Sequence, residues 1–329
     1  DNIPILYLSG GPSMSAYSVK PNFSPAREYG SVSVSAEVIY QPGLVVDVMR
    51  RAFHSLRNGR SGPAIVEIPD DVGEMDVPED TVDSYVSPKR HKFVPQHSDI
   101  KEAVTILLSA TKPVIWSGKG VLMSQASEEL REFAELTEIP VYCTMPGKSG
   151  FDQKHPLALG SGSAATSLQA RTWIQDSDVL LAIGSSLTKT LYGQSIPDGK
   201  VIIQSVETVE DINKEYSVTV GLPGDAKLTL QSLIHEVKSQ IGNDGRKGQT
   251  DTADQIKKIN EKWLSEWNEI LTSDEKPINY YRVIHELENT LDKNNSIVTH
   301  DAGAPRDTIM PFYNPTLPNS YIGWGKSTH

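Results

Sequence analysis

The sequence predicts an α/β protein in which parallel sheets are flanked by helices. Between residues 112 and 206, short apolar runs alternate with segments whose apolar residues recur at helical spacing. The first run, TKPVIWSGKG at 111–120, ends in glycines, as a tight turn from a strand into a helix does. This alternation is typical of a parallel sheet covered on both faces, in which ligands bind beyond the carboxyl ends of the strands.

Length, composition and charge limit the class of protein. The chain has 329 residues, enough for two or three domains, and 38% of them are hydrophobic, which can build full cores. The formal net charge is −11 and no basic cluster is interleaved with aromatics, so we expect no nucleic-acid partner and a small molecule or protein instead. No apolar run approaches the roughly 20 residues that span a bilayer, and no signal segment opens the chain. We therefore expect a cytoplasmic protein without a membrane partner.

Several kinds of reactive site are disfavoured by the residues themselves. Cys143 is the single cysteine, and its apolar surroundings predict a buried core thiol and exclude a disulfide framework. The eight histidines include no His-x-x-x-His pair for zinc, and no Gly-x-Ser-x-Gly nucleophile turn occurs.

The sequence predicts a strand, a loop, a helix and a second strand in the N-terminal third of the chain. Residues 3–9 predict a buried strand, and Val45, Val48, Ala52 and Leu56 mark one face of a helix that ends at Asn58-Gly59. A turn then leads into a short apolar strand closed by Pro69. Residues 73–98 are rich in Pro, Asp and Ser with weak periodicity, which indicates a linker.

A second domain is expected over residues 99–240. It opens with a helix carrying Ile100, Ala103, Val104 and Leu107, for which Ser98 is a plausible N-cap. Strands are then predicted at 112–117, 139–144, 178–186 and 200–204, with helices around 126–137 and 168–174, and a last strand and helix within 218–237.

A polar second linker, residues 241–276, precedes a third α/β unit. Within it Ile256, Ile259, Trp263, Trp267 and Ile270 fall at helical spacing and predict a core or interface stripe rather than a cofactor site. The third unit follows at 277–329, where a helix leads to the apolar run SIVTHDAG and then to a loop ending in SYIGWGKSTH. Both chain ends fall inside expected domains, so we expect the middle of a longer polypeptide.

Three segments in this order resemble the thiamine-diphosphate enzyme family that includes acetolactate synthase. They are RRAFHSLRNGRSGPAIVEIPDDV at 50–72, the succession from KPVIWSGKGV to VGLPGDAKLTLQSL, and NSIVTHDAGAPRD with YIGWGKSTH. The resemblance implies the end of a pyrimidine-binding domain at 1–72 and the start of a diphosphate-binding domain at 277–329. Between them it implies a central Rossmann-like domain at 99–240, of the flavin- or NAD-binding kind.

The resemblance also implies a function. It indicates a thiamine-diphosphate- and Mg²⁺-dependent carboligase or decarboxylase, a transferase or lyase, that acts on 2-keto acids as a homodimer or homotetramer. The family's catalytic glutamate is expected upstream and its Gly-Asp-Gly metal motif downstream, so no catalytic or metal residue is assigned and this chain alone is expected to be inactive. Asn243-Asp244-Gly245 and Asn294-Asn295 are interpreted as turns rather than metal ligands.

The cofactor residues implied by the resemblance lie in two groups. Those expected near the diphosphate follow two strands of the third unit: Gly303, Ala304, Pro305, Gly325, Lys326, Ser327 and Thr328. Those expected in strand-to-helix turns of the central domain are Gly118, Lys119, Gly120, Gly160, Gly184 and Ser185.

Whether FAD or another nucleotide binds the central domain is left open by the sequence. Acetolactate synthases bind FAD there, yet no arginine follows Gly184 and the strand at 200–204 ends in Gln204 rather than an acidic residue. An alternative is therefore a nucleotide- or acyl-CoA-binding module without catalysis. A structural or regulatory homologue that lost the chemistry is a third hypothesis.

Overall fold

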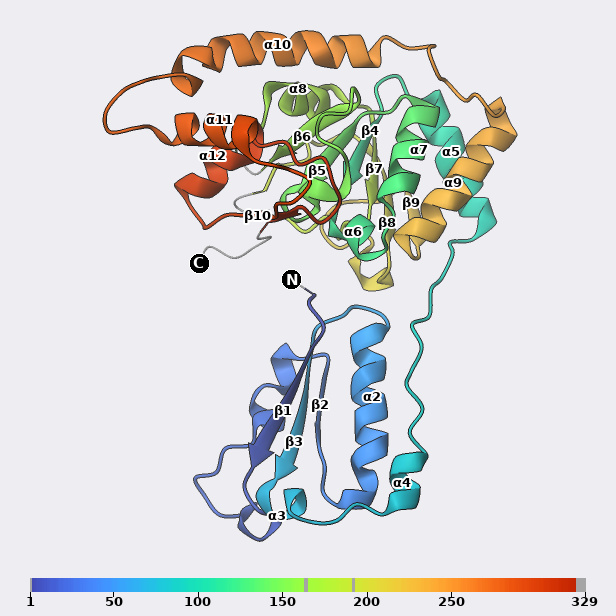
Figure 1. Ribbon diagram of the computed structural model, residues 1–329. Helices are drawn as coiled ribbons and strands as arrows, with labels where there is room; N and C mark the ends of the chain where they lie inside the picture. Colours follow the sequence, from blue (N-terminus) through green and yellow to red (C-terminus); the bar gives the residue numbers. More distant parts are fainter. Residues whose placement is uncertain (1, 163–164, 191–192, 324–329) are drawn as a thin grey trace. The chain divides into compact units, whose positions relative to one another are not determined.

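The computed structural model describes residues 2–162, 165–190 and 193–323, and they form two compact units. The division falls between Lys92 and Phe93. Figure 1 shows the elements of both units, coloured along the sequence. No helix in the described ranges is long and apolar enough to cross a membrane.

The N-terminal unit is a three-stranded parallel sheet with strand order β1-β3-β2. The predicted helix is confirmed as α2, which ends with Asn58 as its C-cap and buries Val48, Ala52 and Leu56 against the sheet. The elements of this unit are β1 (Ile5–Gly11), η1 (Met14–Ala16), α1 (Pro25–Glu28), η2 (Gly30–Val32), β2 (Ser35–Val38), η3 (Pro42–Leu44), α2 (Val45–Arg57), β3 (Pro63–Pro69), α3 (Asp70–Gly73) and α4 (Glu79–Asp83).

The first strand is where predicted, but the expectation that it is buried is wrong. Ile5, Tyr7 and Leu8 of β1 are 43%, 58% and 59% exposed. The reason is the topology, because β1 lies at the end of the strand order and pairs with β3 alone among the described residues. An apolar run does not reveal whether its strand is central or at an edge.

The second unit is built on a six-stranded parallel sheet with strand order β6-β5-β4-β7-β8-β9. Helices alternate with its strands, which confirms the predicted α/β fold with helices flanking parallel strands. The elements are α5 (His97–Ser109), β4 (Val114–Ser117), α6 (Lys119–Met123), α7 (Ser127–Thr137), β5 (Val141–Thr144), η4 (Met145–Gly150), β6 (Ala158–Gly162), α8 (Leu168–Asp176), β7 (Val179–Ile183), β8 (Val201–Val206), η5 (Val209–Asp211), β9 (Val220–Pro223) and α9 (Ala226–Ile241).

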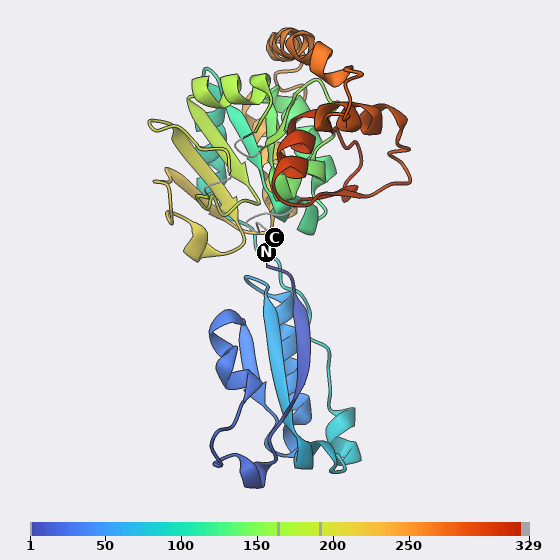
Figure 2. The same ribbon diagram turned by 90° about the vertical axis from the view of Figure 1, so that its left-hand side faces the viewer.

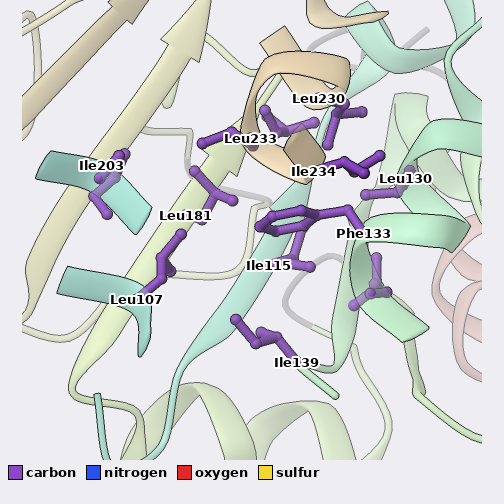
Figure 3. Close-up of a cluster of buried hydrophobic side chains, with 14 of the residues drawn as sticks. Leu107, Ile115, Leu130, Phe133, Ile139, Leu181, Ile203, Leu230, Leu233 and Ile234 are labelled. Carbon is purple, nitrogen blue, oxygen red and sulfur yellow. The ribbon is translucent and has the colours of Figure 1, made fainter. Parts of the chain in front are cut away.

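Successive side chains of each strand point to opposite faces of this sheet. Helices cover each face, so the side chains on both faces are buried. Ile115, Leu181 and Ile203 pack with Leu130 and Phe133 of α7 and with α9, as Figure 3 shows. Their neighbours along the strands belong to the other face, where α8 and α10 (Thr252–Leu271) lie (Figure 2): Val114, Trp116, Leu180, Ala182 and Ile202.

Two local predictions in this unit are wrong. Gly160 was expected in a turn but lies in the edge strand β6, where it has a φ of 94° at a register shift against β5. Ser98 is not the N-cap of α5, because the helix begins at His97 after Gln96, and the Ser98 hydroxyl donates to Asp99 instead.

The C-terminal part of the second unit has its own apolar core. Trp263 of α10 stacks on Phe312 of α12 with ring centroids 4.7 Å apart, which confirms that the tryptophan stripe is core. The elements here are α10, α11 (Tyr280–Thr290), β10 (Val298–Thr299), α12 (Ala304–Phe312) and β11 (Tyr321–Ile322). The domain limits at 72, 98, 240 and 276 stay a prediction.

Candidate functional site

The two loops expected near the diphosphate leave neighbouring parallel strands. Val298 and Thr299 of β10 pair with Tyr321 and Ile322 of β11, and Thr299 Oγ1 donates to the Ile322 carbonyl oxygen at 3.1 Å. Because the strands are parallel, the segments after Thr299 and after Ile322 begin at the same edge. Gly325, Lys326, Ser327 and Thr328 lie outside the described residues.

The first of these loops ends in an exposed helix N-terminus. Gly303 has a φ of 73°, which favours glycine, and no atom of the described residues lies within 4 Å of the position that a Cβ would occupy. Ala304 and Pro305 are exposed and open α12, whose N-terminal end carries unsatisfied N–H groups and a partial positive charge. This end of α12 can receive an anion, although Pro305 has no N–H to donate.

His300 lies directly before this loop and was not predicted as a site residue. It is 7% exposed, and its Nδ1 lies 2.9 Å from the Asp301 carbonyl oxygen. A carbonyl only accepts, so Nδ1 carries the proton and the buried Nε2 is an acceptor that has no partner among the described residues. Desolvation by burial lowers the pKa of His300, which favours this neutral form.

Lys148 lies beneath the same region and was also missed. Its Nζ donates to Ser161 Oγ at 2.7 Å and to the Met310 carbonyl oxygen at 2.8 Å, and the residue is 1% exposed. Burial lowers the pKa of Lys148 to about 7. Nothing in the segment MPGKSGF distinguishes such a lysine from a solvated one, since its partners are distant in sequence.

The structure brings together four of the predicted residues of the central sheet: Gly118, Gly120, Gly184 and Ser185. The amide of Gly118 donates to the Ile183 carbonyl at 2.8 Å, that of Gly120 to the Gly184 carbonyl at 2.9 Å, and that of Gly184 to the Ser205 carbonyl at 2.9 Å. These three donors are thus used within the protein.

Close packing explains why two of these positions are glycine. A Cβ on Gly118 would lie 2.3 Å from the Gly184 carbonyl oxygen, and one on Gly184 would lie 2.7 Å from the Val121 nitrogen. Of the other two predicted residues, Lys119 stands between Gly118 and Gly120 and opens the five-residue helix α6, whereas Gly160 lies in the edge strand β6. The glycines therefore serve the contact between two turns.

Cys143 is a core residue, as the sequence predicts. It is 0% exposed, and desolvation raises the pKa of its thiol to about 11. The turns expected at 243–245 and 294–295 are present, since Gly245 N donates to Gly242 O and Asn295 N to Asp292 O. Across the described ranges, no group of three or more His, Cys, Asp and Glu side chains could hold a metal ion.

Comparison with known proteins gives matches over most of the chain. Residues 100–233 match the family model of the thiamine pyrophosphate enzyme central domain. A probable acetolactate synthase large subunit of Methanocaldococcus jannaschii is 30% identical over 306 residues, covering 87% of this chain and 49% of that protein. Its counterpart in Methanococcus aeolicus is 28% identical over 302 residues, covering 85% and 49%. This chain thus spans about half the length of these relatives.

The fold is also found among solved structures. The benzoylformate decarboxylase of Polynucleobacter necessarius superposes with a TM-score of 0.75 at 17% sequence identity. The match covers 97% of this chain and 57% of that one. At this identity the likeness concerns the fold.

Proposed function

This chain belongs to the thiamine-diphosphate-dependent enzyme family, and we propose that it is part of an acetolactate synthase-like carboligase or decarboxylase that acts on 2-keto acids. The observation that carries this proposal is the match to acetolactate synthase large subunits over 85% and 87% of the chain. The complete enzyme would use Mg²⁺ and assemble as a homodimer or homotetramer.

The residues at the α12 N-terminus fit a diphosphate. Gly303 leaves open space beside its Cα, the neighbouring helix end offers positive potential, and Ala304 and Pro305 add no side chain large enough to obstruct it. We propose that the backbone at Gly303 and Ala304 holds the diphosphate, together with the loop that contains Gly325, Lys326, Ser327 and Thr328. Thiamine diphosphate, when bound, supplies the nucleophilic carbon with which a 2-keto acid can lose carbon dioxide.

Beneath this loop lie two buried basic groups, His300 and Lys148. Burial lowers the pKa of both, so His300 is favoured as a neutral imidazole near pH 7, whereas Lys148, with a pKa of about 7, is partly protonated there and loses its charge as the pH rises. Their proposed role is to position the loop, because His300 Nδ1 fixes the Asp301 carbonyl and Lys148 fixes the end of α12.

The central sheet is proposed as a scaffold in this enzyme, without a flavin. The N–H groups of Gly118, Gly120 and Gly184 already donate to carbonyl oxygens of the protein, so they are not free to receive a phosphate. We therefore propose no nucleotide cofactor for the central sheet.

The proposal is tested with two proteins, the 329-residue chain and the longer polypeptide encoded around it. Each is assayed with pyruvate and other 2-keto acids, thiamine diphosphate and Mg²⁺, and release of carbon dioxide is measured. We expect turnover by the longer polypeptide and none by the chain alone, whose sequence contains no Gly-Asp-Gly motif. A longer polypeptide that consumes no 2-keto acid would overturn the proposed function. Turnover by the 329-residue chain alone would show that neither the expected glutamate nor the Gly-Asp-Gly motif is needed.

The role of the α12 loop is tested by matched glycine variants of the longer polypeptide. Gly303 and Gly199 both have positive φ, 73° and 82°, and open space at the Cβ position. Gly303→Ala and Gly199→Ala both place a side chain at positive φ, which costs about 1–3 kcal/mol. Only Gly303→Ala should raise the concentration of thiamine diphosphate needed for half-maximal activity; equal values in the two variants would contradict the assignment.

A further inference from the structure

A buried amine lies at the contact between the central sheet and α12, the helix that begins at the Gly303 loop. Lys148 belongs to η4, directly after β5, and is 1% exposed. Its Nζ donates to the Met310 carbonyl oxygen of α12 and to Ser161 Oγ of β6. Met145, at the start of η4, packs in the apolar core of the C-terminal segment. Figure 1 shows α12 next to the β5 and β6 edge of the sheet. One short element of the central sheet therefore holds α12.

Lys148 supplies a donor that the last turn of α12 lacks. In a regular helix the Met310 carbonyl would accept from the amide four residues further on, which is that of Asn314. Here the Asn314 amide donates to Glu288 Oε2 at 2.9 Å instead. The Met310 carbonyl is one of the last of the helix, and such carbonyls need partners from outside it. Lys148 is therefore a C-terminal cap of α12 that comes from a distant part of the chain.

The surroundings of this amine suit its neutral form. A neutral amine has two N–H groups, and the acceptors Met310 O and Ser161 Oγ use both. An ammonium has a third N–H. The Tyr321 ring, with its centroid 5.6 Å from Nζ, offers an aromatic face rather than a carboxylate. Burial accordingly lowers the pKa of Lys148 to about 7.

Five other titratable side chains lie around the amine: Cys143 of β5, Glu288 of α11, Lys293 after α11, His300 before the Gly303 loop and Tyr321 of β11. Burial raises the pKa of Cys143 and Tyr321 and lowers that of His300, which favours the neutral form of each from about pH 7 to about 9. Burial also lowers the pKa of Lys293, but this lysine pairs with Glu288 at 2.6 Å. Lys148 is therefore the group at this contact whose charge changes near pH 7.

We propose that Lys148 makes the position of the cofactor helix depend on pH: the neutral amine holds α12 against the central sheet, and protonation of the amine releases it. The link to the cofactor rests on the proposed function, in which the N-terminus of the same nine-residue helix receives the diphosphate. In the released form the amine reaches water and regains its ordinary pKa. Between about pH 7 and 10 the released form therefore binds the proton and the held form does not, so rising pH favours the held form.

Hydrogen exchange of the α12 amides in the 329-residue chain tests the contact without any cofactor. After correction for the intrinsic exchange rate, their protection should rise between about pH 7 and 8.5, by up to about tenfold per pH unit. This rise should be absent in Lys148→Met and present in Lys154→Met, whose lysine side chain is 56% exposed. The α2 amides of the N-terminal unit should respond alike in all three proteins. Protection of α12 in the parent chain that does not rise with pH would overturn the proposal without any variant, as would equal slopes in the parent and Lys148→Met.

Calorimetric titration of the longer polypeptide with thiamine diphosphate and Mg²⁺ tests the link to the cofactor. The dissociation constant should fall from pH 7 to 8.5 by a larger factor in the parent and in Lys154→Met than in Lys148→Met. Ionisation of the cofactor itself is common to the three proteins, so it does not affect this comparison. An equal factor in all three would overturn the link between Lys148 and the cofactor. No binding at either pH would instead contradict the proposed function, and hydrogen exchange would still decide whether Lys148 holds α12.

Discussion

Lys148 donates from a fully buried amine to the carbonyl oxygen of Met310, 162 residues further along the chain. The same amine donates to Ser161 in the edge strand β6. One side chain therefore links Ser161 of the central sheet to Met310 of the C-terminal segment. Burial of its amine disfavours the charged form. This relationship makes the stability of the second unit depend on pH.

The first prediction concerns that pH dependence. The pKa of Lys148 is lowered to about 7 in the fold from an ordinary value of 10.5. Between these values the unfolded chain binds the proton and the folded chain does not, so the free energy of unfolding should rise with pH, by up to about 1.4 kcal/mol per pH unit. Urea unfolding followed by the intrinsic fluorescence of the tryptophans should show this rise between pH 7 and about 9.

The control is Lys148→Met, which keeps the length of the side chain without a titrating group. The free energy of unfolding of this variant should change less with pH between pH 7 and about 9. Above about pH 9 the titration of Cys143 also contributes. Burial raises the pKa of this thiol, so its contribution lowers the free energy of unfolding as the pH rises, opposite to that of Lys148. A slope that is identical in parent and variant would contradict the assignment to Lys148.

The second prediction concerns a buried carboxylate in the N-terminal unit. Glu67 is 0% exposed and accepts from Ser24 Oγ at 2.6 Å, from the Ala26 amide at 3.0 Å and from the Tyr17 hydroxyl at 3.1 Å. Ser24→Ala should lower the stability of this unit by about 1.5–3 kcal/mol, the contribution of a hydrogen bond to a charged group. Hydrogen exchange of the amides of β3 measures the loss, and exposed Ser18→Ala is the control. Equal protection of the β3 amides in Ser24→Ala and Ser18→Ala would show that the hydrogen bond from Ser24 does not stabilise this unit.

The third prediction separates packing from backbone strain at glycine. Gly184→Ala and Gly199→Ala both place a side chain at positive φ, 61° and 82°, which costs about 1–2 kcal/mol. Only at Gly184 does the new Cβ also meet backbone atoms of Gly120 and Val121 within 3 Å. Gly184→Ala should therefore lower the melting temperature clearly more than Gly199→Ala; comparable shifts would mean that the turns do not pack tightly.

The fourth prediction uses Cys143 as a reporter of the central sheet. Because the chain has one cysteine, which is fully buried with a pKa raised to about 11, the thiol should not react with a disulfide reagent in native buffer at pH 8. In denaturing urea one thiol per chain should react promptly. Rapid labelling of the native protein would show that β5 opens to solvent.

Local patterns in the sequence were sufficient for most of the fold. The stripe of Val48, Ala52 and Leu56 predicted α2, and the apolar run before Pro69 predicted β3, because each pattern reflects burial of one element. The edge strand β6 was missed because its glycines resemble a turn, and Gly160 at positive φ does interrupt the pairing. The exposure of β1 could not be predicted, because it depends on which strands surround it.

The sites were harder to predict than the fold. Gly118 and Gly184 were expected to approach a ligand, yet the sequence cannot show whether an amide donates to a ligand or to a carbonyl of the protein. Lys148 had no signal in the sequence, since its partners Ser161 and Met310 are brought to it only by folding. The loop at Gly303 was located by resemblance, and its contact with a cofactor remains a prediction.

The exposed face of β1 has a practical consequence for anyone who purifies this chain. A parallel edge strand whose Ile5, Tyr7 and Leu8 face solvent offers unpaired backbone groups and apolar side chains to any similar strand. An exposed edge of this kind is a predicted site of self-association at high protein concentration. Solubility of the isolated chain is therefore expected to depend on β1.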